Sequence, residues 1–248
     1  GFVALLEDSA TMLLEDSGAG PEPACREYTH SLSWALLIGL LRLFNRSGEF
    51  QSMLSDIDDT LGETIPSFHN IELRLNQLKE AVEKDVAGRV KEVRYYIDEI
   101  EKRAEAMCLG ERLHREGKLP KRICHCDTKV NNMLFDKDGK VLCVIDLDTV
   151  MPSFIFSDFG DFLRSAANTG AEDDKNLDNV DFNMEIFKAF TKGYLEGTKS
   201  FLLPIEKENL PYAAKLFPYM QTVRFLADYI NGDTYYKIQY LLSLFMMF

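Results

Sequence analysis

The chain has 248 residues, 46% of them hydrophobic and 27% charged, which is enough to bury the core of one large domain or two small ones. Its 40 Asp and Glu residues outnumber 28 Lys and Arg, and the formal net charge of -12 argues against nucleic acid as a partner. The five cysteines show neither a disulfide framework nor paired zinc spacing, which favours a reducing cytosol.

The strongest apolar run in the chain is LSWALLIGLLRLF at residues 32–44. This run is shorter than the roughly 20 residues that a membrane-spanning helix requires, and it contains Arg42. No basic segment precedes it, so a secretory signal is not predicted. We therefore expect a buried helix here, in a cytoplasmic protein without a membrane partner.

The first half of the chain is predicted to be helical. It opens with two near-copies of one short string, LLEDSAT and LLEDSGA, which are too short for a repeat fold. Apolar residues at helical spacing then predict a helix over 26–50, followed by an ordered loop that reaches His69. Between residues 72 and 117 the same spacing predicts two helices, with a break near Ala87 and Gly88.

The pattern changes beyond Pro120, where short runs of strand-forming residues appear. Three strands are predicted, at 122–125, 132–135 and 141–145, with a hairpin turn at 136–139. Four helices are predicted after them, at 158–167, 184–195, 205–217 and 218–230. The predicted fold class is therefore α+β: mostly α, with a small β insertion in the middle.

The chemistry-bearing residues concentrate in this insertion, which reads HCDTKVNNMLFDKDGKVLCVIDLD from His125 to Asp148. A loop between strands holds Asp127, Lys129 and Asn132, and the next strand ends at Asp146. Phosphoryl transfer needs a carboxylate that orients the acceptor, oxygen ligands for Mg²⁺ and positive charge, and this segment supplies all three. Oxygen-bearing groups framed by apolar strands are costly to bring together without a cation, so the pattern favours a metal–phosphate site.

The spacing from His125 through Asn132, followed by a hydrophobic strand and Asp146, resembles the catalytic and metal loops of the protein-kinase-like superfamily. Together with ETIPSFHN, VIDLDTVMP, SDFGD and RFLADYINGD, it resembles the N-acetylhexosamine 1-kinases of the aminoglycoside phosphotransferase and choline kinase superfamily. The resemblance covers about residues 50–240. It implies the C-terminal helical lobe of a kinase that uses ATP and Mg²⁺ and phosphorylates the anomeric hydroxyl of an N-acetylhexosamine.

The resemblance also implies roles for individual residues of the catalytic loop. Asp127 would orient the attacking hydroxyl and accept its proton, and Lys129 would offset charge on the transferred group. His125 would brace the loop by hydrogen bonding. Asn132 and Asp146 would bind Mg²⁺ and, with it, the nucleotide phosphates.

Other residues receive roles outside that loop. Asp148 would be a second metal contact or a substrate contact, and Asp158 would pin the catalytic loop through backbone N–H groups. Arg224, Tyr235 and Arg164 are the candidate sugar contacts, although a helix-surface arginine or a core tyrosine would explain them equally. Ser165 follows Arg164 where the family often has an aromatic residue. His69 has two interpretations, as a further substrate contact or as a residue that caps a loop.

The N-terminal part of the chain departs from the family pattern. Only Gly18 and Gly20 hint at a phosphate-covering loop, and no lysine precedes Lys79. We therefore expect an atypical or degenerate nucleotide-binding lobe at 1–48, a kinase-like catalytic lobe at 49–240 and an apolar tail at 241–248. A truncated or frame-altered relative is favoured over an unusual nucleotide cover, and it puts the activity of the chain by itself in question.

Two other functions compete with the kinase. Asp146 and Asp148 fit the Asp-x-Asp signature of haloacid-dehalogenase-like phosphatases, in which the first Asp is the nucleophile, but this leaves HCDTKVNN unexplained. A non-catalytic, kinase-derived module would bind nucleotide or sugar without turnover. The identity of the sugar, the nucleotide preference and the oligomeric state are not set by the sequence.

Overall fold

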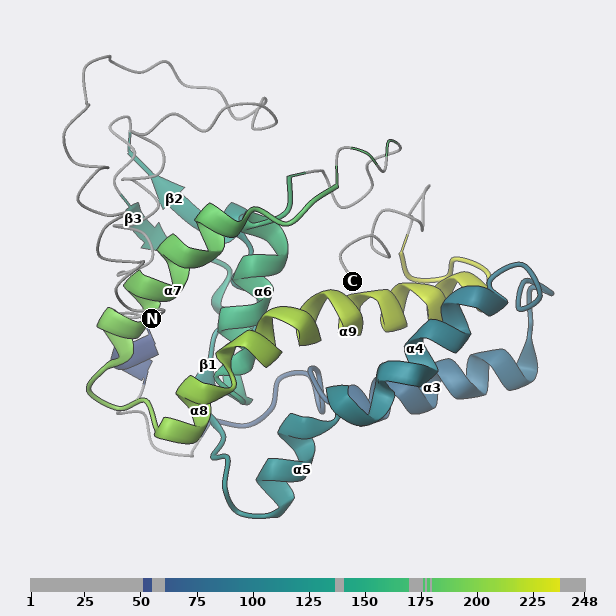
Figure 1. Ribbon diagram of the computed structural model, residues 1–248, viewed down its shortest axis with the longest axis horizontal. Coiled ribbons are helices and arrows are strands. Elements are labelled where there is room, and N and C mark those ends of the chain that lie inside the picture. Colours follow the sequence, from purple (N-terminus) through teal and green to yellow (C-terminus); the bar gives the residue numbers. More distant parts are fainter. Residues whose placement is uncertain are drawn as a thin grey trace.

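The computed structural model describes residues 51–54, 61–136, 141–169, 176, 178 and 180–236. Over these residues the protein is mostly helical with two small sheets, so the predicted fold class is confirmed (Figure 1). The predictions for segment 1–48, the helix at 26–50, most of the turn at 136–139 and the tail at 241–248 fall outside the described residues. The division into three segments stays a prediction.

The two helices predicted between residues 72 and 117 are present, and a third, shorter one follows them. Helix α3 (Ile71–Lys84) begins where the Asn70 side chain accepts the N–H of Leu73 at 2.8 Å, and it ends at Asp85 in a left-handed conformation. After a turn that contains Gly88 at φ 70°, α4 (Arg94–Met107) and α5 (Leu109–Arg115) follow.

The β insertion consists of two antiparallel pairs. Strand β1 (Arg122–Cys124) pairs with β4 (Met151–Ser153), and β2 (Met133–Phe135) pairs with β3 (Val141–Val144). Strand β4 was not predicted because it has three residues and contains Pro152, which weakens any strand assignment. Pro152 is tolerated because each strand of a two-stranded sheet is an edge.

Four helices complete the described fold: α6 (Phe156–Ala166), α7 (Met184–Thr198), α8 (Pro204–Glu208) and α9 (Leu210–Ile230). The prediction that a helix ends before Pro218 is wrong, because α9 continues through it. An interior proline costs about 3 kcal/mol, but most of α9 is buried between two cores, and that burial outweighs the lost hydrogen bond.

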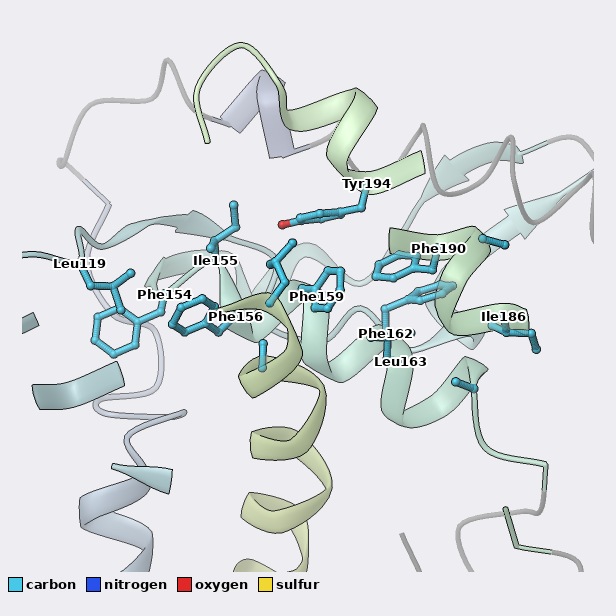
Figure 2. Close-up of a cluster of buried hydrophobic side chains, with 14 of the residues drawn as sticks. Leu119, Phe154, Ile155, Phe156, Phe159, Phe162, Leu163, Ile186, Phe190 and Tyr194 are labelled. Atoms are coloured by element: carbon cyan, nitrogen blue, oxygen red, sulfur yellow. The ribbon is translucent and has the colours of Figure 1, made fainter. Parts of the chain in front are cut away.

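The long helix α9 lies beside α6 at one end and beside α3 and α4 at the other (Figure 1). One core gathers aromatic side chains of α6 and α7, where the Phe162 and Phe190 rings stack at 4.4 Å (Figure 2). The second core lies between α3, α4 and α9. At the α6–α9 crossing, a Cβ on Gly160 would lie 2.5 Å from the Ala213 carbonyl oxygen, so only glycine permits this approach.

No helix in the described ranges is both long and apolar enough to cross a membrane.

Candidate active site

Helix α6 holds the loop at 125–132, predicted from the sequence to be the catalytic loop, in place through Asp158. Its carboxylate accepts the N–H of His125 at 2.9 Å and the N–H of Cys126 at 2.8 Å. The Thr128 hydroxyl donates to the backbone oxygen of Asp158 at 2.8 Å. Cys126 adopts φ 64°, which is strained for a residue with a side chain, so this loop shape depends on the bonds from α6.

The electrostatics of Asp158 follow from its buried position. Burial raises the pKa of Asp158 to about 6, although the two backbone N–H groups act in the opposite direction. The negative charge of nearby Asp161 adds to the increase in the pKa. The ionised carboxylate therefore stabilises the loop by hydrogen bonds, but its burial costs desolvation free energy.

The buried His125 side chain joins the catalytic loop to the segment after β3. Its Nδ1 lies 3.3 Å from the N–H of Asp127, and its Nε2 lies 2.9 Å from the backbone oxygen of Ile145. Both ring nitrogens are thus engaged in holding the loop. The Thr149 hydroxyl donates to the His125 backbone oxygen at 2.8 Å, so a second hydrogen bond joins the two segments.

Three of the predicted site residues meet at the half-buried Asp127 carboxylate. Lys129 Nζ lies 2.7 Å and Asn132 Nδ2 lies 2.9 Å from Asp127 Oδ2. Asn132 Nδ2 also donates to the Asp127 backbone oxygen at 2.8 Å. Within the described ranges no group donates to Oδ1 of Asp127, so this oxygen can receive a further partner.

Asp146 is the residue directly after Ile145, which contacts Asn132. The N–H of Ile145 donates to the Asn132 backbone oxygen at 2.9 Å, and Asp146 then turns outward at φ 65° with an exposed side chain. Asp148 is exposed as well, in the 3-10 turn Leu147–Thr149. The backbone thus brings Asn132 and Asp146 to the same edge of the β insertion.

The residues at this edge suit a hard divalent cation. In the described part of the chain, no three His, Cys, Asp or Glu side chains are grouped to hold a metal ion. Mg²⁺ does not need such a group, because it keeps several waters and substrate phosphates and takes only one or two protein ligands. Since Asn132 Nδ2 faces Asp127, its Oδ1 points away from that carboxylate. The donor set of Asn132 and Asp146 therefore fits Mg²⁺.

The predicted sugar contacts lie on α6, on α9 and in the segment that follows α9. Arg164 is buried on α6, and its Nε lies 3.0 Å from Asp161 Oδ1. Arg224 is half-buried on α9, with its guanidinium 5.6 Å from the centre of the Tyr236 ring. Tyr235 is 75% exposed and lies against Tyr236, with ring centres 4.7 Å apart.

His69 belongs to the surroundings of these arginines. Its Nδ1 lies 3.0 Å from the Ser157 hydroxyl, and its ring stacks on Phe68 at 4.4 Å. Burial lowers the pKa of His69 well below its usual value, and the charges of Arg224, Arg74 and Arg164 lower it further. We call these three arginines the arginine cluster.

The sequence interpretation missed the part that Arg74, Phe68, Asp161 and Tyr236 play here. These residues come from separate segments: Phe68 and Asp161 lie within ETIPSFHN and SDFGD but received no role there, and Arg74 and Tyr236 lie outside the quoted motifs. Ser165, the departure from the family pattern, has a local function: its hydroxyl accepts the N–H of Val130 at 3.2 Å and so ties α6 to the catalytic loop.

Comparison with known proteins identifies the family of the chain. Residues 42–190, more than half of the chain, match the sequence profile of the Phosphotransferase enzyme family. The chain belongs to this family, which is part of the protein-kinase-like superfamily. Among solved structures, the chain is similar to the aminoglycoside phosphotransferase APH(2'')-Ib with ADP bound. The identity is 16%, the TM-score is 0.47, and the match covers 93% of this chain and 69% of that one.

Proposed function

We propose that this chain transfers the γ-phosphoryl group of ATP to a sugar hydroxyl, specifically the anomeric hydroxyl of an N-acetylhexosamine. Membership of the phosphotransferase family supports the reaction class. The observation that carries the proposal is the Asp127 carboxylate, which Lys129 and Asn132 hold by Oδ2 while Oδ1 accepts nothing from the described residues.

In the proposed reaction, the acceptor oxygen attacks the γ-phosphorus, the bond to the β–γ bridging oxygen breaks and ADP leaves. The proton of the acceptor hydroxyl passes to Asp127 Oδ1, because Oδ2 is already engaged. Lys129 lies 2.7 Å from the same carboxylate, where its ammonium can offset negative charge on the transferred group. His125 and Asp158 act indirectly, as positioning residues of the loop.

Asn132 and Asp146 are the residues proposed to hold Mg²⁺, with Asp148 as a further contact for metal or substrate. Bound there, the ion would neutralise charge on the nucleotide phosphates. Arg164, Arg224 and Tyr235 are proposed to bind the acceptor, since they lie around a single region between α6 and the end of α9.

The direct test is to incubate the purified protein with ATP, Mg²⁺ and a panel of N-acetylhexosamines and to follow the products by phosphorus NMR. We expect a sugar 1-phosphate, and we expect Asp127→Ala to reduce its formation at least about a hundredfold. Asp98→Asn, which changes an exposed carboxylate on α4, should leave the rate unchanged. Absence of any phosphorylated sugar would refute the proposal.

The same assay separates the competing functions. A phosphatase would release inorganic phosphate from a sugar phosphate, and Asp146→Asn would abolish that release. A binding module would bind nucleotide or sugar and form neither product. The kinase is preferred because the phosphatase gives no role to the contacts among Asp127, Lys129 and Asn132.

A further inference from the structure

The arginine cluster is built around the aromatic ring of Phe68. Arg74 donates to the Phe68 backbone oxygen from Nε at 3.2 Å and from Nη2 at 2.7 Å. The guanidinium of Arg224 lies over the Phe68 ring, 5.2 Å from its centre, and 5.6 Å from the centre of the Tyr236 ring. Arg74 of α3 and Arg224 of α9 thus both contact Phe68, the first at its backbone oxygen and the second at its ring.

Helix α6 adds the third arginine. His69, next to Phe68, contacts Ser157 on α6. Ser157, Asp161 and Arg164 are spaced by four and three residues, so they share one face of that helix. Arg164 therefore extends along the face that His69 contacts, and its charge contributes to the low pKa of His69.

Positive charge exceeds negative charge in this region. Among the described residues, Asp161 pairs with Arg164, and Asp228 accepts the backbone N–H groups of Tyr235 and Tyr236. In the part of the chain that the structure describes, neither Arg74 nor Arg224 forms an ion pair with a carboxylate. Gathering partly buried cations without counter-charge is costly, above all in a chain of net charge -12.

Two buried polar atoms nearby also await partners. Asp161 Oδ2 and the Tyr236 hydroxyl accept or donate no hydrogen bond within the described ranges. Asp161 is 6% exposed and lies one helical turn after Asp158, the residue that holds the catalytic loop. A ligand at the cluster would therefore meet an acceptor and a donor for its hydroxyl groups, close to the site of phosphoryl transfer.

We propose that the arginine cluster binds an anionic oxyacid group, a carboxylate or a phosphate, that the phosphoryl acceptor carries. The acceptor is then an acidic sugar, with its charge held by Arg74 and Arg224 and its hydroxyl groups by Asp161 and Tyr236. That the bound anion belongs to the phosphoryl acceptor rests on the proposed kinase function. The anion site itself is inferred from the contacts of the cluster alone. Guanidinium groups suit this ligand because they bind oxyacids through charge-assisted hydrogen bonds.

Binding without nucleotide tests the site independently of turnover. Calorimetric titration of the full chain would compare sugars that differ in one group: glucose with glucuronate, and N-acetylglucosamine with its 6-phosphate. We expect the acidic member of at least one pair to bind about tenfold tighter or more, and the pair that shows the preference identifies carboxylate or phosphate. Equal affinities within both pairs overturn the proposal.

Variants of Arg224 assign the effect to the cluster. Arg224→Gln should remove most of the preference for the acidic sugar, and Arg224→Lys should keep part of it because the charge remains. Arg94→Gln removes an exposed arginine on α4 and should leave the preference unchanged. A preference that persists in Arg224→Gln overturns the proposal, and circular dichroism verifies that each variant is folded.

Turnover separates this inference from the proposed function. If the protein binds an acidic sugar tightly but does not phosphorylate it in the presence of ATP and Mg²⁺, the kinase function is refuted and the anion site is supported. If the protein phosphorylates neutral and acidic sugars and binds both with equal affinity, the kinase function stands and the anion site is refuted.

Discussion

The catalytic loop and the arginine cluster lie on neighbouring faces of α6 but are stabilised in different ways. The loop is fixed by hydrogen bonds to one buried carboxylate, Asp158, and its strained residue Cys126 depends on them. The cluster is held by contacts around Phe68, and two of its three arginines, Arg74 and Arg224, form no ion pair with a carboxylate of the described residues. The loop is therefore held by neutral hydrogen-bond donors around one buried acid, whereas the cluster gathers positive charge.

Helix α6 carries Asp158 and Arg164 and α9 carries Arg224, so both regions depend on the crossing of these two helices. We predict that Gly160→Ala destabilises the protein by about 3 kcal/mol or more, because the new methyl group would overlap the Ala213 backbone. Urea unfolding measures this loss. Gly110→Ala is the matched control: its nearest new contact is 3.4 Å from the Tyr212 hydroxyl, and stability close to that of the wild type is expected. Equal stability of the two variants would contradict the close approach.

The strand that leads into the catalytic loop has an anchor of its own. Arg122 on β1 forms two hydrogen bonds with Glu206, at 2.6 and 2.9 Å, and the Glu206 side chain is fully buried. We predict that Glu206→Gln costs about 3 kcal/mol in urea unfolding, because it leaves the half-buried guanidinium without its counter-charge.

An exposed pair of the same geometry provides the control. Arg115 and Glu72 also form two hydrogen bonds, at 2.7 and 2.9 Å, but both side chains face solvent. Glu72→Gln should therefore leave the unfolding midpoint almost unchanged. A similar loss in both variants would show that burial does not decide the strength of these pairs.

The difference between the two regions also explains what the sequence could predict. The loop residues Asp127, Lys129 and Asn132 lie within six consecutive positions, so their spacing alone predicts that they share one site. Asp158 lies further along the chain, but its contact with the loop could be predicted from the family resemblance. Helices of regular apolar spacing were predictable for the same local reason.

The arginine cluster could not be predicted, since Arg74, Arg164 and Arg224 come from three helices and meet only through tertiary packing. The predictions at Pro218 and at strand β4 were wrong for a related reason. Local preference disfavoured a helix through Pro218 and a strand at β4, and burial or strand pairing outweighed that preference. Sequence reasoning thus recovered the local chemistry and missed what long-range contacts assemble.

The two regions should respond to pH in opposite ways, because the pKa of Asp158 is raised and the pKa of His69 is lowered. The pKa of Asp158 is raised to about 6, so the folded state binds the proton more tightly and stability falls as pH rises from about 4 to 6. The pKa of His69 is lowered, so its contribution is complete above the unfolded pKa of 6.5 and is lost as pH falls below that value.

We therefore predict opposite slopes when variants are subtracted from the wild type in urea unfolding between pH 4 and 7.5. Relative to Asp158→Asn, the wild type should lose on the order of 2 to 3 kcal/mol as pH rises to 6. Relative to His69→Gln, the wild type should gain stability as pH rises to 6.5. Slopes of the same sign would show that one of the two groups lies in a different environment from the one described here.

The smallest expected change in stability, and the most specific change in activity, belongs to Lys129. Its ion pair with Asp127 is partly exposed, at 39% and 25% of the two side chains, so Lys129→Met should cost less than about 1 kcal/mol of folding free energy. If the ammonium stabilises the transferred phosphoryl group, the same change lowers turnover about a hundredfold. Because the arginine cluster is untouched, the affinity for the acceptor should stay the same. A variant that loses stability and turnover together would make Lys129 a structural residue of the loop, and catalysis would then rest on Asp127 alone.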